Sequence, residues 1–86
     1  MGMEKQWVLY ILQCKDGTLY TGITDDLQRR LAAHESGKGA KYTRGRGPLT
    51  LRYTDKCESR SDALRREIAV KKLSRKDKEA LCATMR

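Results

Sequence analysis

The 86-residue sequence lacks long apolar runs, and none approaches the roughly 18 residues that a membrane-spanning helix requires. It has only three cysteines, Cys14, Cys57 and Cys82, whose wide spacing fits neither a disulfide framework nor the short paired spacings of a zinc site. The N-terminal residues lead into an apolar run of only about six residues, so we expect no signal peptide. These absences predict a soluble, cytoplasmic protein with reduced structural cysteines and no membrane partner.

Acidic residues are also scarce, because 11 Asp and Glu stand against 19 Lys and Arg and leave a formal net charge of +8. Such an excess of cations favours a polyanionic partner. A chain of 86 residues buries only about 60% of its unfolded surface and cannot divide its core. We therefore expect residues 1–86 to form a single domain that binds nucleic acid.

An apolar segment and a turn near the N-terminus predict a β-hairpin. Every position from Trp7 to Leu12 is apolar, which is typical of a strand that is central in its sheet and covered on both faces. Gly17 follows at a turn, where glycine readily adopts the positive φ that hairpin loops need. A second strand is expected from Thr18 to Ile23.

The length of the turn decides which side chains share a face. A two-residue loop, Asp-Gly, would place Tyr10 and Tyr20 on opposite faces. A three-residue loop, Lys-Asp-Gly, would pair Tyr10 with Gly22 and put both tyrosines on one face. We favour the longer loop because it gathers apolar residues on the other face, namely Leu9, Ile11, Leu19 and Ile23. It also predicts a gap above Gly22 through which a ligand reaches the Tyr10 hydroxyl.

A helix is expected after the hairpin. Asp25 with Gln28 three residues later predicts its start, and Gly37 or Gly39 its end. Helical spacing places four residues on one side of this helix: Leu27, Arg30, Leu31 and His34. Two polar groups, Arg30 and His34, therefore border the buried stripe.

The segment from Ser36 to Pro48 contains four glycines, four cations and no acid, and it predicts a loop. Its glycines allow backbone amides to approach an anion, its cations neutralise phosphates, and Tyr42 can stack on a base. The residues expected to contact nucleic acid are Gly22 on the hairpin and Lys38, Lys41, Tyr42, Arg44 and Arg46 in the loop.

The remaining sequence predicts a third strand and two helices. The strand contains Leu49, Leu51 and Tyr53 in alternation with polar residues. Ser59 with Asp62 predicts a helix from about Arg60 to Leu73, and Ser74 with Asp77 predicts a short helix through Leu81. We interpret the basic run from Lys71 to Lys78 as a solvated helix face.

Glu67 falls near the middle of the apolar arc of the longer helix, which is formed by Ala63, Leu64, Ile68 and Val70. A carboxylate that points inward needs a function, because burial of an unpaired charge is costly. Metal binding is one reading of this position. An ion pair with Lys71, one turn later, is the other.

The residues Tyr10, Tyr20, Gly22, Arg30, His34 and Glu67, in this order and at this spacing, resemble the GIY-YIG nuclease family. Val8-Leu9-Tyr10 stands for the first motif and Tyr20-Thr21-Gly22 for the second. The resemblance covers about Trp7 to Leu81. The stretches Leu-Tyr-Thr-Gly-Ile-Thr, Gly-Lys-Gly-Ala-Lys-Tyr-Thr-Arg and Leu-Arg-Arg-Glu look like those of small stand-alone bacterial members.

The resemblance implies an α/β (α+β) fold, with a three-stranded antiparallel sheet flanked by helices in the order β-β-α-β-α-α. It also implies phosphodiester cleavage with one divalent metal ion, Mg²⁺ or Mn²⁺, held by Glu67. Arg30, rather than Arg29, matches the family arginine, eight residues after the motif glycine, and His34 follows four residues later. Tyr10 is the candidate general base, Tyr20 would orient water or phosphate, and Arg30 would stabilise the phosphoryl charge.

Two departures from the family pattern keep a second function open. Val8 and Leu9 replace the glycine and isoleucine of the first motif, and the chain has no asparagine, although many members carry one after the metal glutamate. The first reading is an endonuclease that acts on DNA, including structured or damaged DNA in repair. The alternative is a non-catalytic DNA-binding or RNA-binding module of the same fold. Either could rely on a protein partner for substrate choice, and the sequence indicates no oligomeric state.

Overall fold

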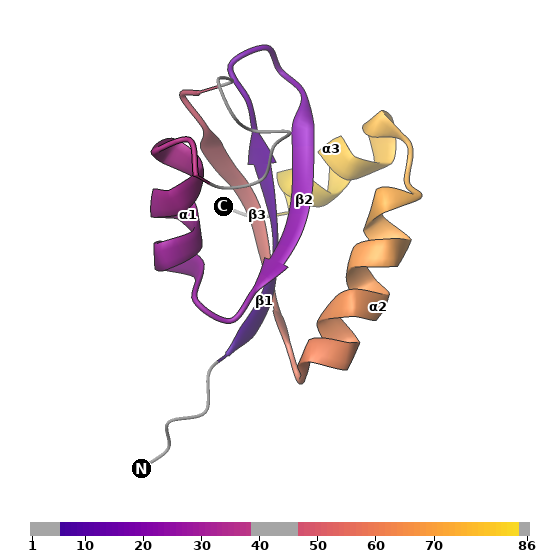
Figure 1. The fold of residues 1–86 in the computed structure, drawn as a ribbon. Coiled ribbons are helices and arrows are strands. Elements are labelled where there is room, and N and C mark those ends of the chain that lie inside the picture. Colours follow the sequence, from indigo (N-terminus) through magenta and orange to yellow (C-terminus); the bar gives the residue numbers. More distant parts are fainter. Residues whose placement is uncertain (1–5, 39–46, 85–86) are drawn as a thin grey trace.

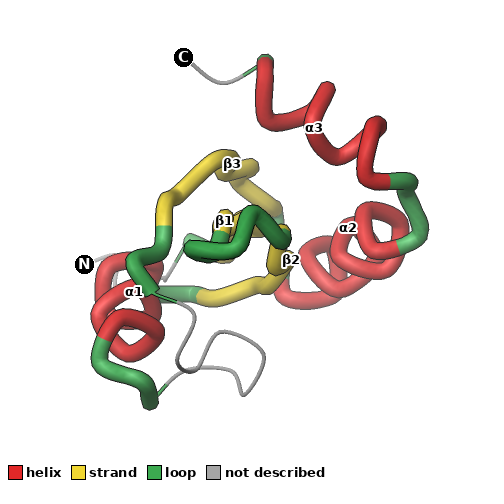
Figure 2. The backbone as a smooth tube through the Cα atoms, turned by 90° about the horizontal axis from the view of Figure 1, so that it is seen from above, coloured by secondary structure: helices red, strands yellow, loops and turns green. Residues whose placement is uncertain are grey.

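The computed structural model describes residues 6–38 and 47–84, which form six elements in the predicted order. They are β1 (Trp7–Gln13), β2 (Leu19–Thr24), α1 (Leu27–Glu35), β3 (Thr50–Cys57), α2 (Arg60–Lys71) and α3 (Arg75–Ala83). The strands make one antiparallel sheet in the order β2-β1-β3, so the apolar strand β1 is central, as predicted. Helix α1 lies on one side of this sheet, and α2 and α3 lie on the other (Figure 1 and Figure 2).

The turn between β1 and β2 has the predicted three-residue form. The Gly17 N–H donates to the Cys14 carbonyl over 2.9 Å, and the Cys14 N–H donates to the Thr18 carbonyl over 2.8 Å. Gly17 has a φ of 87°, which a residue with a side chain rarely adopts. The Asp16 carboxylate accepts from the Thr18 N–H over 3.1 Å and holds the loop. Strand β2 begins one residue later than predicted, at Leu19.

This turn sets the register of the whole hairpin. Tyr10 pairs with Gly22 and Leu12 pairs with Tyr20, which confirms the register that the segregation of apolar residues predicted. Both tyrosines therefore lie on the face of the sheet that α1 covers.

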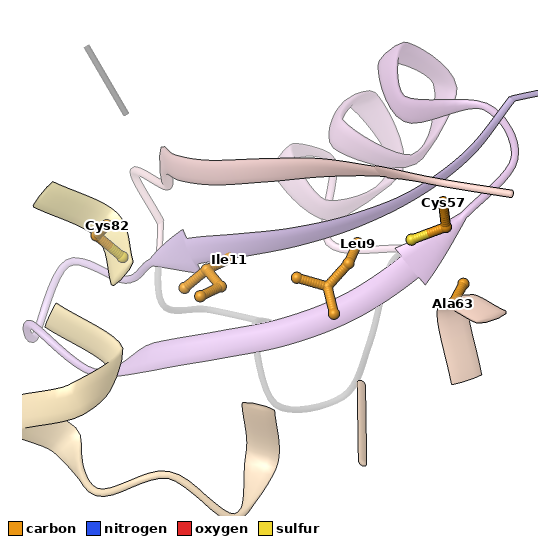
Figure 3. Close-up of a cluster of buried hydrophobic side chains, with 5 residues drawn as sticks. All are labelled: Leu9, Ile11, Cys57, Ala63 and Cys82. Carbon is orange, nitrogen blue, oxygen red and sulfur yellow. The ribbon is translucent and has the colours of Figure 1, made fainter. Parts of the chain in front are cut away.

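The opposite face carries the hydrophobic core between the sheet and the helices α2 and α3. Five buried residues form its centre, and Figure 3 shows them: Leu9, Ile11, Cys57, Ala63 and Cys82. Partly buried side chains pack against them, including Leu19 and Ile23, which were predicted for this face. All three cysteines are free and buried. Burial raises the pKa of the Cys57 and Cys82 thiols, so both stay protonated near neutral pH.

Helix α1 begins one residue later than the sequence pattern suggested. Asp26 is its N-cap, because its carboxylate accepts from the Arg29 N–H over 3.2 Å, so the expectation of a start at Asp25 is wrong. The Thr24 hydroxyl accepts from the Asp26 N–H over 3.1 Å and fixes the cap in place. Gly37, with a φ of 82°, lies directly after the C-cap and ends the helix, as expected.

Helix α2 starts where predicted, since the Ser59 hydroxyl accepts from the Asp62 N–H over 3.1 Å, but it ends at Lys71 rather than Leu73. The assignment of Ile68 to its apolar face is wrong, because Ile68 is 55% exposed. The helix packs through Ala63, and at 100° per residue Ile68 lies about 140° around the axis from it. Within the described part of the chain, no helix is long and apolar enough to cross a membrane.

Candidate active site

Three aromatic rings meet on the face of the sheet that α1 covers. The Tyr10 and Tyr20 ring centroids are 6.3 Å apart, and the His34 ring lies 5.8 Å from Tyr10 and 5.4 Å from Tyr20. The hairpin register supplies the two tyrosines, and α1 supplies the histidine from its last turn. The structure therefore brings together three residues that the sequence singled out, and they form what we term the ring cluster.

A buried hydrogen bond joins two members of the ring cluster. Tyr10 Oη lies 2.9 Å from His34 Nε2, and the two residues are 0% and 2% exposed. Burial raises the pKa of Tyr10, and a hydrogen bond from Arg30 opposes this rise. Burial lowers the pKa of His34, and the Arg30 charge lowers it further. Near neutral pH both groups are thus uncharged, and the phenol can donate its proton to Nε2.

Arg30 links this buried bond to the surface. It lies one helical turn before His34, and its interaction with the Tyr10 phenol raises the pKa of Arg30. Arg30 also lines an open pocket of about 360 Å³ with Thr24, Asp25, Asp26, Arg29 and Ala33. An anion that enters this pocket would therefore meet a guanidinium that already contacts the Tyr10 phenol.

The predicted gap above Gly22 is absent from the described structure, and that expectation is wrong. A Cβ atom built on Gly22 would lie 2.6 Å from Tyr10 Oη and 2.7 Å from Tyr10 Cζ. The Tyr10 phenol itself therefore fills the space that the glycine leaves. Gly22 is buried beneath it and offers no open surface to nucleic acid in this structure.

We expect Gly22→Ala to destabilise the fold by roughly 1–3 kcal/mol, as over-packing usually does. The added methyl would meet a phenol that is fully buried and bonded to His34, so Tyr10 cannot move without breaking that bond. Gly47→Ala is the matched control, because nothing lies within 4 Å of a Cβ at Gly47. Urea unfolding checks the prediction, and equal midpoints for the two variants would contradict it.

Glu67 lies on α2, which packs against β2 on the side of the sheet opposite α1. Its side chain is only 18% exposed, and its carboxylate pairs with Lys71 Nζ at 3.4 Å, so both readings of its position have support. Its charge contributes to the raised pKa of Tyr10, after burial and the Tyr20 interaction. The Glu67 charge therefore makes a small contribution to the electrostatics of the ring cluster.

Glu67 offers a single carboxylate, which fits only a divalent ion that keeps most of its ligands as water or substrate oxygens. Within residues 6–38 and 47–84, no three His, Cys, Asp or Glu side chains gather into a metal-binding group. Mg²⁺, however, commonly binds through one or two carboxylates, and water and substrate phosphate complete its octahedron. Glu67 supplies one such carboxylate, and the Lys71 side chain paired with it is 54% exposed.

The single histidine of the chain permits a direct test of the ring cluster. Its folded pKa is lowered from the usual 6.5, so the unfolded chain binds the proton more readily. Stability should therefore fall as pH drops below 6.5, by about 1.4 kcal/mol per unit by which the pKa is depressed. NMR titration of the imidazole gives that pKa, and urea unfolding from pH 5 to 8, with His34→Gln for comparison, gives the stability. A folded pKa at or above 6.5 would contradict the buried, neutral imidazole.

The described residues cover only part of the predicted nucleic-acid surface. Lys38 is exposed directly after α1, where the basic loop begins. Four other predicted contacts lie outside the described residues: Lys41, Tyr42, Arg44 and Arg46. Their roles remain predictions.

A second pocket, of about 310 Å³, lies beside β2 and was not predicted from the sequence. It is lined by Leu19, Tyr20, Thr21, Lys71 and Lys78. Lys71 and Lys78 belong to different helices, so no helical periodicity connects them. The basic run that contains them was interpreted as a solvated face, yet Lys78 is only partly exposed. The number of lysines and arginines in this run was the one signal in the sequence. That number does not show that Lys71 and Lys78 line a pocket with residues of β2.

The sheet order and the ring cluster place this protein in a class of small α+β domains. In this class the candidate catalytic groups lie on a β-hairpin. Over residues 6–80 the chain matches the GIY-YIG catalytic domain, so it belongs to the GIY-YIG family, whose domains are generally nucleases. The resemblance seen in the sequence is confirmed.

Relatives and solved structures agree with this family. A UPF0213 protein of Halobacterium salinarum is 59% identical over 73 residues, which are 85% of this chain and 95% of the relative. The solution NMR structure of the UPF0213 protein BH0048 from Bacillus halodurans has a TM-score of 0.61 at 52% identity, over 93% of this chain and 85% of that one. The solution NMR structure of the protein EF2693 from E. faecalis has a TM-score of 0.66 at 45% identity. The match covers 98% of this chain and 90% of that one. These similarities confirm the predicted fold.

Proposed function

We propose that this protein is a metal-dependent endonuclease that hydrolyses phosphodiester bonds in DNA, with structured or damaged DNA as its substrate. The observation that carries the proposal is the buried hydrogen bond between Tyr10 Oη and His34 Nε2, with Arg30 beside it. A phenol is a poor base at neutral pH unless its proton has a destination and its anion a counter-charge. His34 Nε2 offers the first, and because its pKa is lowered it holds the proton only briefly; Arg30 offers the second.

In the proposed reaction, Tyr10 passes its proton to His34 Nε2 as its oxygen takes a proton from the attacking water. The resulting hydroxide attacks phosphorus, and the bond to the leaving oxygen breaks. The leaving oxyanion takes a proton from solvent, and His34 releases its extra proton to solvent, which restores the starting pair. Arg30 stabilises the charge that grows on the phosphoryl oxygens, and Tyr20 orients the water or the phosphate. Because Tyr10 is 0% exposed, the reaction requires the ring cluster to open when substrate binds.

Glu67 is the residue that would hold Mg²⁺ or Mn²⁺ in this scheme. A bound divalent ion supplies Lewis-acid stabilisation of the phosphoryl oxygens and the leaving oxygen. In the described structure this carboxylate forms an ion pair with Lys71, whose Nζ lies 3.4 Å from Glu67 Oε2. The net charge of +8 and the GIY-YIG domain both support a nucleic-acid partner, and DNA is the partner that we propose.

The proposal is tested by incubating the protein with end-labelled branched, flapped and single-stranded DNA, and with RNA of the same sequences. Each substrate is assayed with Mg²⁺, with Mn²⁺ and with EDTA. We expect cleavage of a DNA substrate with either metal and none with EDTA. Binding without cleavage of any substrate would overturn the proposal.

A second candidate function, a DNA-binding or RNA-binding module without catalysis, is favoured by two observations. The chain has no asparagine to fill the family position after the glutamate, and the Tyr10 hydroxyl is enclosed. Such a module would bind nucleic acid with an affinity that falls with salt, at a slope of about 0.9 per phosphate contact in duplex DNA. Its affinity would not change in Glu67→Ala, and metal-dependent cleavage would be absent.

A further inference from the structure

The second pocket, beside β2, collects polar groups from three elements. Lys71 reaches it from the last turn of α2 and Lys78 from α3, while Tyr20 and Thr21 line it from β2. Two lysine side chains thus line a pocket at one short stretch of an edge strand. Lys78 is only partly exposed, whereas its neighbour Lys76 is exposed.

Thr21 gives this pocket a polar group that lacks a partner. The residue is 4% exposed, and within the described chain its Oγ1 atom is buried without a hydrogen bond. Buried hydroxyls are nearly always bonded, because an unsatisfied one carries the full cost of its desolvation. Because Thr21 lines the pocket, a small movement of its side chain would let a bound ligand oxygen pair with this hydroxyl and remove that cost.

The backbone of Thr21 adds a second donor. The Cys14 N–H donates to the Thr18 carbonyl, and backbone groups alternate in direction along an antiparallel strand. The backbone N–H and C=O groups of Tyr20 and Gly22 therefore point to β1. The backbone N–H of Thr21 points the other way, to the outer edge of β2. The pocket thus combines two ammonium groups, a hydroxyl and an outward amide, which is a set of donors suited to a phosphate.

The pocket is also connected to the ring cluster. Tyr20 lines the pocket, and its ring lies 5.4 Å from His34. Lys71 lines it as well, and its Nζ lies 3.4 Å from Glu67 Oε2. A group bound in the pocket would therefore contact Tyr20, a member of the ring cluster, and Lys71, the partner of Glu67.

We propose that this pocket, through Lys71, Lys78 and Thr21, binds a backbone phosphate next to the scissile one on the DNA strand that is cut. The inference rests on the proposed function, because it assumes that a nucleic-acid strand crosses the ring cluster. It extends that function by assigning a phosphate subsite that fixes the path of the strand along β2.

Thr21→Val and Lys78→Gln test the subsite, and Lys76→Gln is the matched control on the same helix. Binding of a short single-stranded DNA is measured in EDTA over a range of salt, and inorganic phosphate is titrated separately by NMR of the Thr21 amide. We expect each subsite variant to weaken DNA binding roughly tenfold, since hydrogen bonds to charged groups are strong. Lys78→Gln should also reduce the salt slope by about 0.7.

Thr21→Val should keep or raise the melting temperature, because it removes an unsatisfied hydroxyl, so weaker binding would not reflect unfolding. Lys78→Gln, at a partly exposed lysine, provides the same test if the valine variant folds poorly. Wild-type affinity in both subsite variants would overturn the subsite and leave the proposed function intact. A wild-type protein that binds inorganic phosphate at Thr21 but no DNA would overturn both together.

Discussion

Tyr10→Phe is expected to lower the rate of DNA cleavage by about 10²–10⁴-fold, the usual contribution of a general base. The substitution removes the hydroxyl that both accepts the proton of water and passes its own proton to His34. DNA binding should remain close to that of the wild type, because Tyr10 is 0% exposed and Arg30 retains its charge. Single-turnover cleavage and binding in EDTA measure the two effects separately.

Tyr53→Phe is the matched control for this substitution, because Tyr53 packs against the core on the opposite face of the sheet. It should change cleavage little. Tyr10→Phe should also lose roughly 1–3 kcal/mol of stability, since His34 Nε2 is left buried without its partner. A Tyr10→Phe enzyme that cleaves within a few-fold of the wild-type rate would show that the phenol is not the base.

Glu67→Gln is expected to reduce metal-dependent cleavage by about 10³-fold, because a metal ion supplies several kcal/mol of transition-state stabilisation. The substitution keeps the shape of the side chain and removes its charge. DNA binding in EDTA should be equal or tighter, because a negative charge near the strand is lost. Titration of Mn²⁺ into the protein and DNA, followed by cleavage rate, measures the change.

Glu58→Gln serves as the control for Glu67, because Glu58 is an exposed carboxylate just before α2. It should leave the Mn²⁺ dependence unchanged. If Glu67→Gln cleaves as fast as the wild type at every Mn²⁺ concentration, Glu67 is not the metal ligand. Its role would then be the ion pair with Lys71, the other reading of its position.

The hairpin was predictable from sequence because local rules agree there. A glycine at the turn, a three-residue loop and the two-residue period of the apolar side chains all select one register. The structure has that register, with Tyr10 opposite Gly22. The positions of Arg30 and His34 on α1 followed in the same way, from helical spacing.

Tertiary contacts decided the features that sequence patterns missed. The Tyr10 phenol folds over Gly22 because His34 holds its hydroxyl, and no local pattern records that bond. Ile68 faces solvent because α2 turns its Ala63 side to the sheet. The pocket lined by Thr21, Lys71 and Lys78 joins β2 to two different helices, so no local pattern predicts it.

The measurement that would test the proposed site most directly is a crystal structure of the protein with Mn²⁺ and a short DNA duplex. Anomalous scattering locates the metal independently of the refined coordinates. We predict a manganese peak at the Glu67 carboxylate, with a backbone phosphate between Tyr10 and Arg30. Manganese bound elsewhere, with DNA that does not approach Tyr10, would contradict the proposed site.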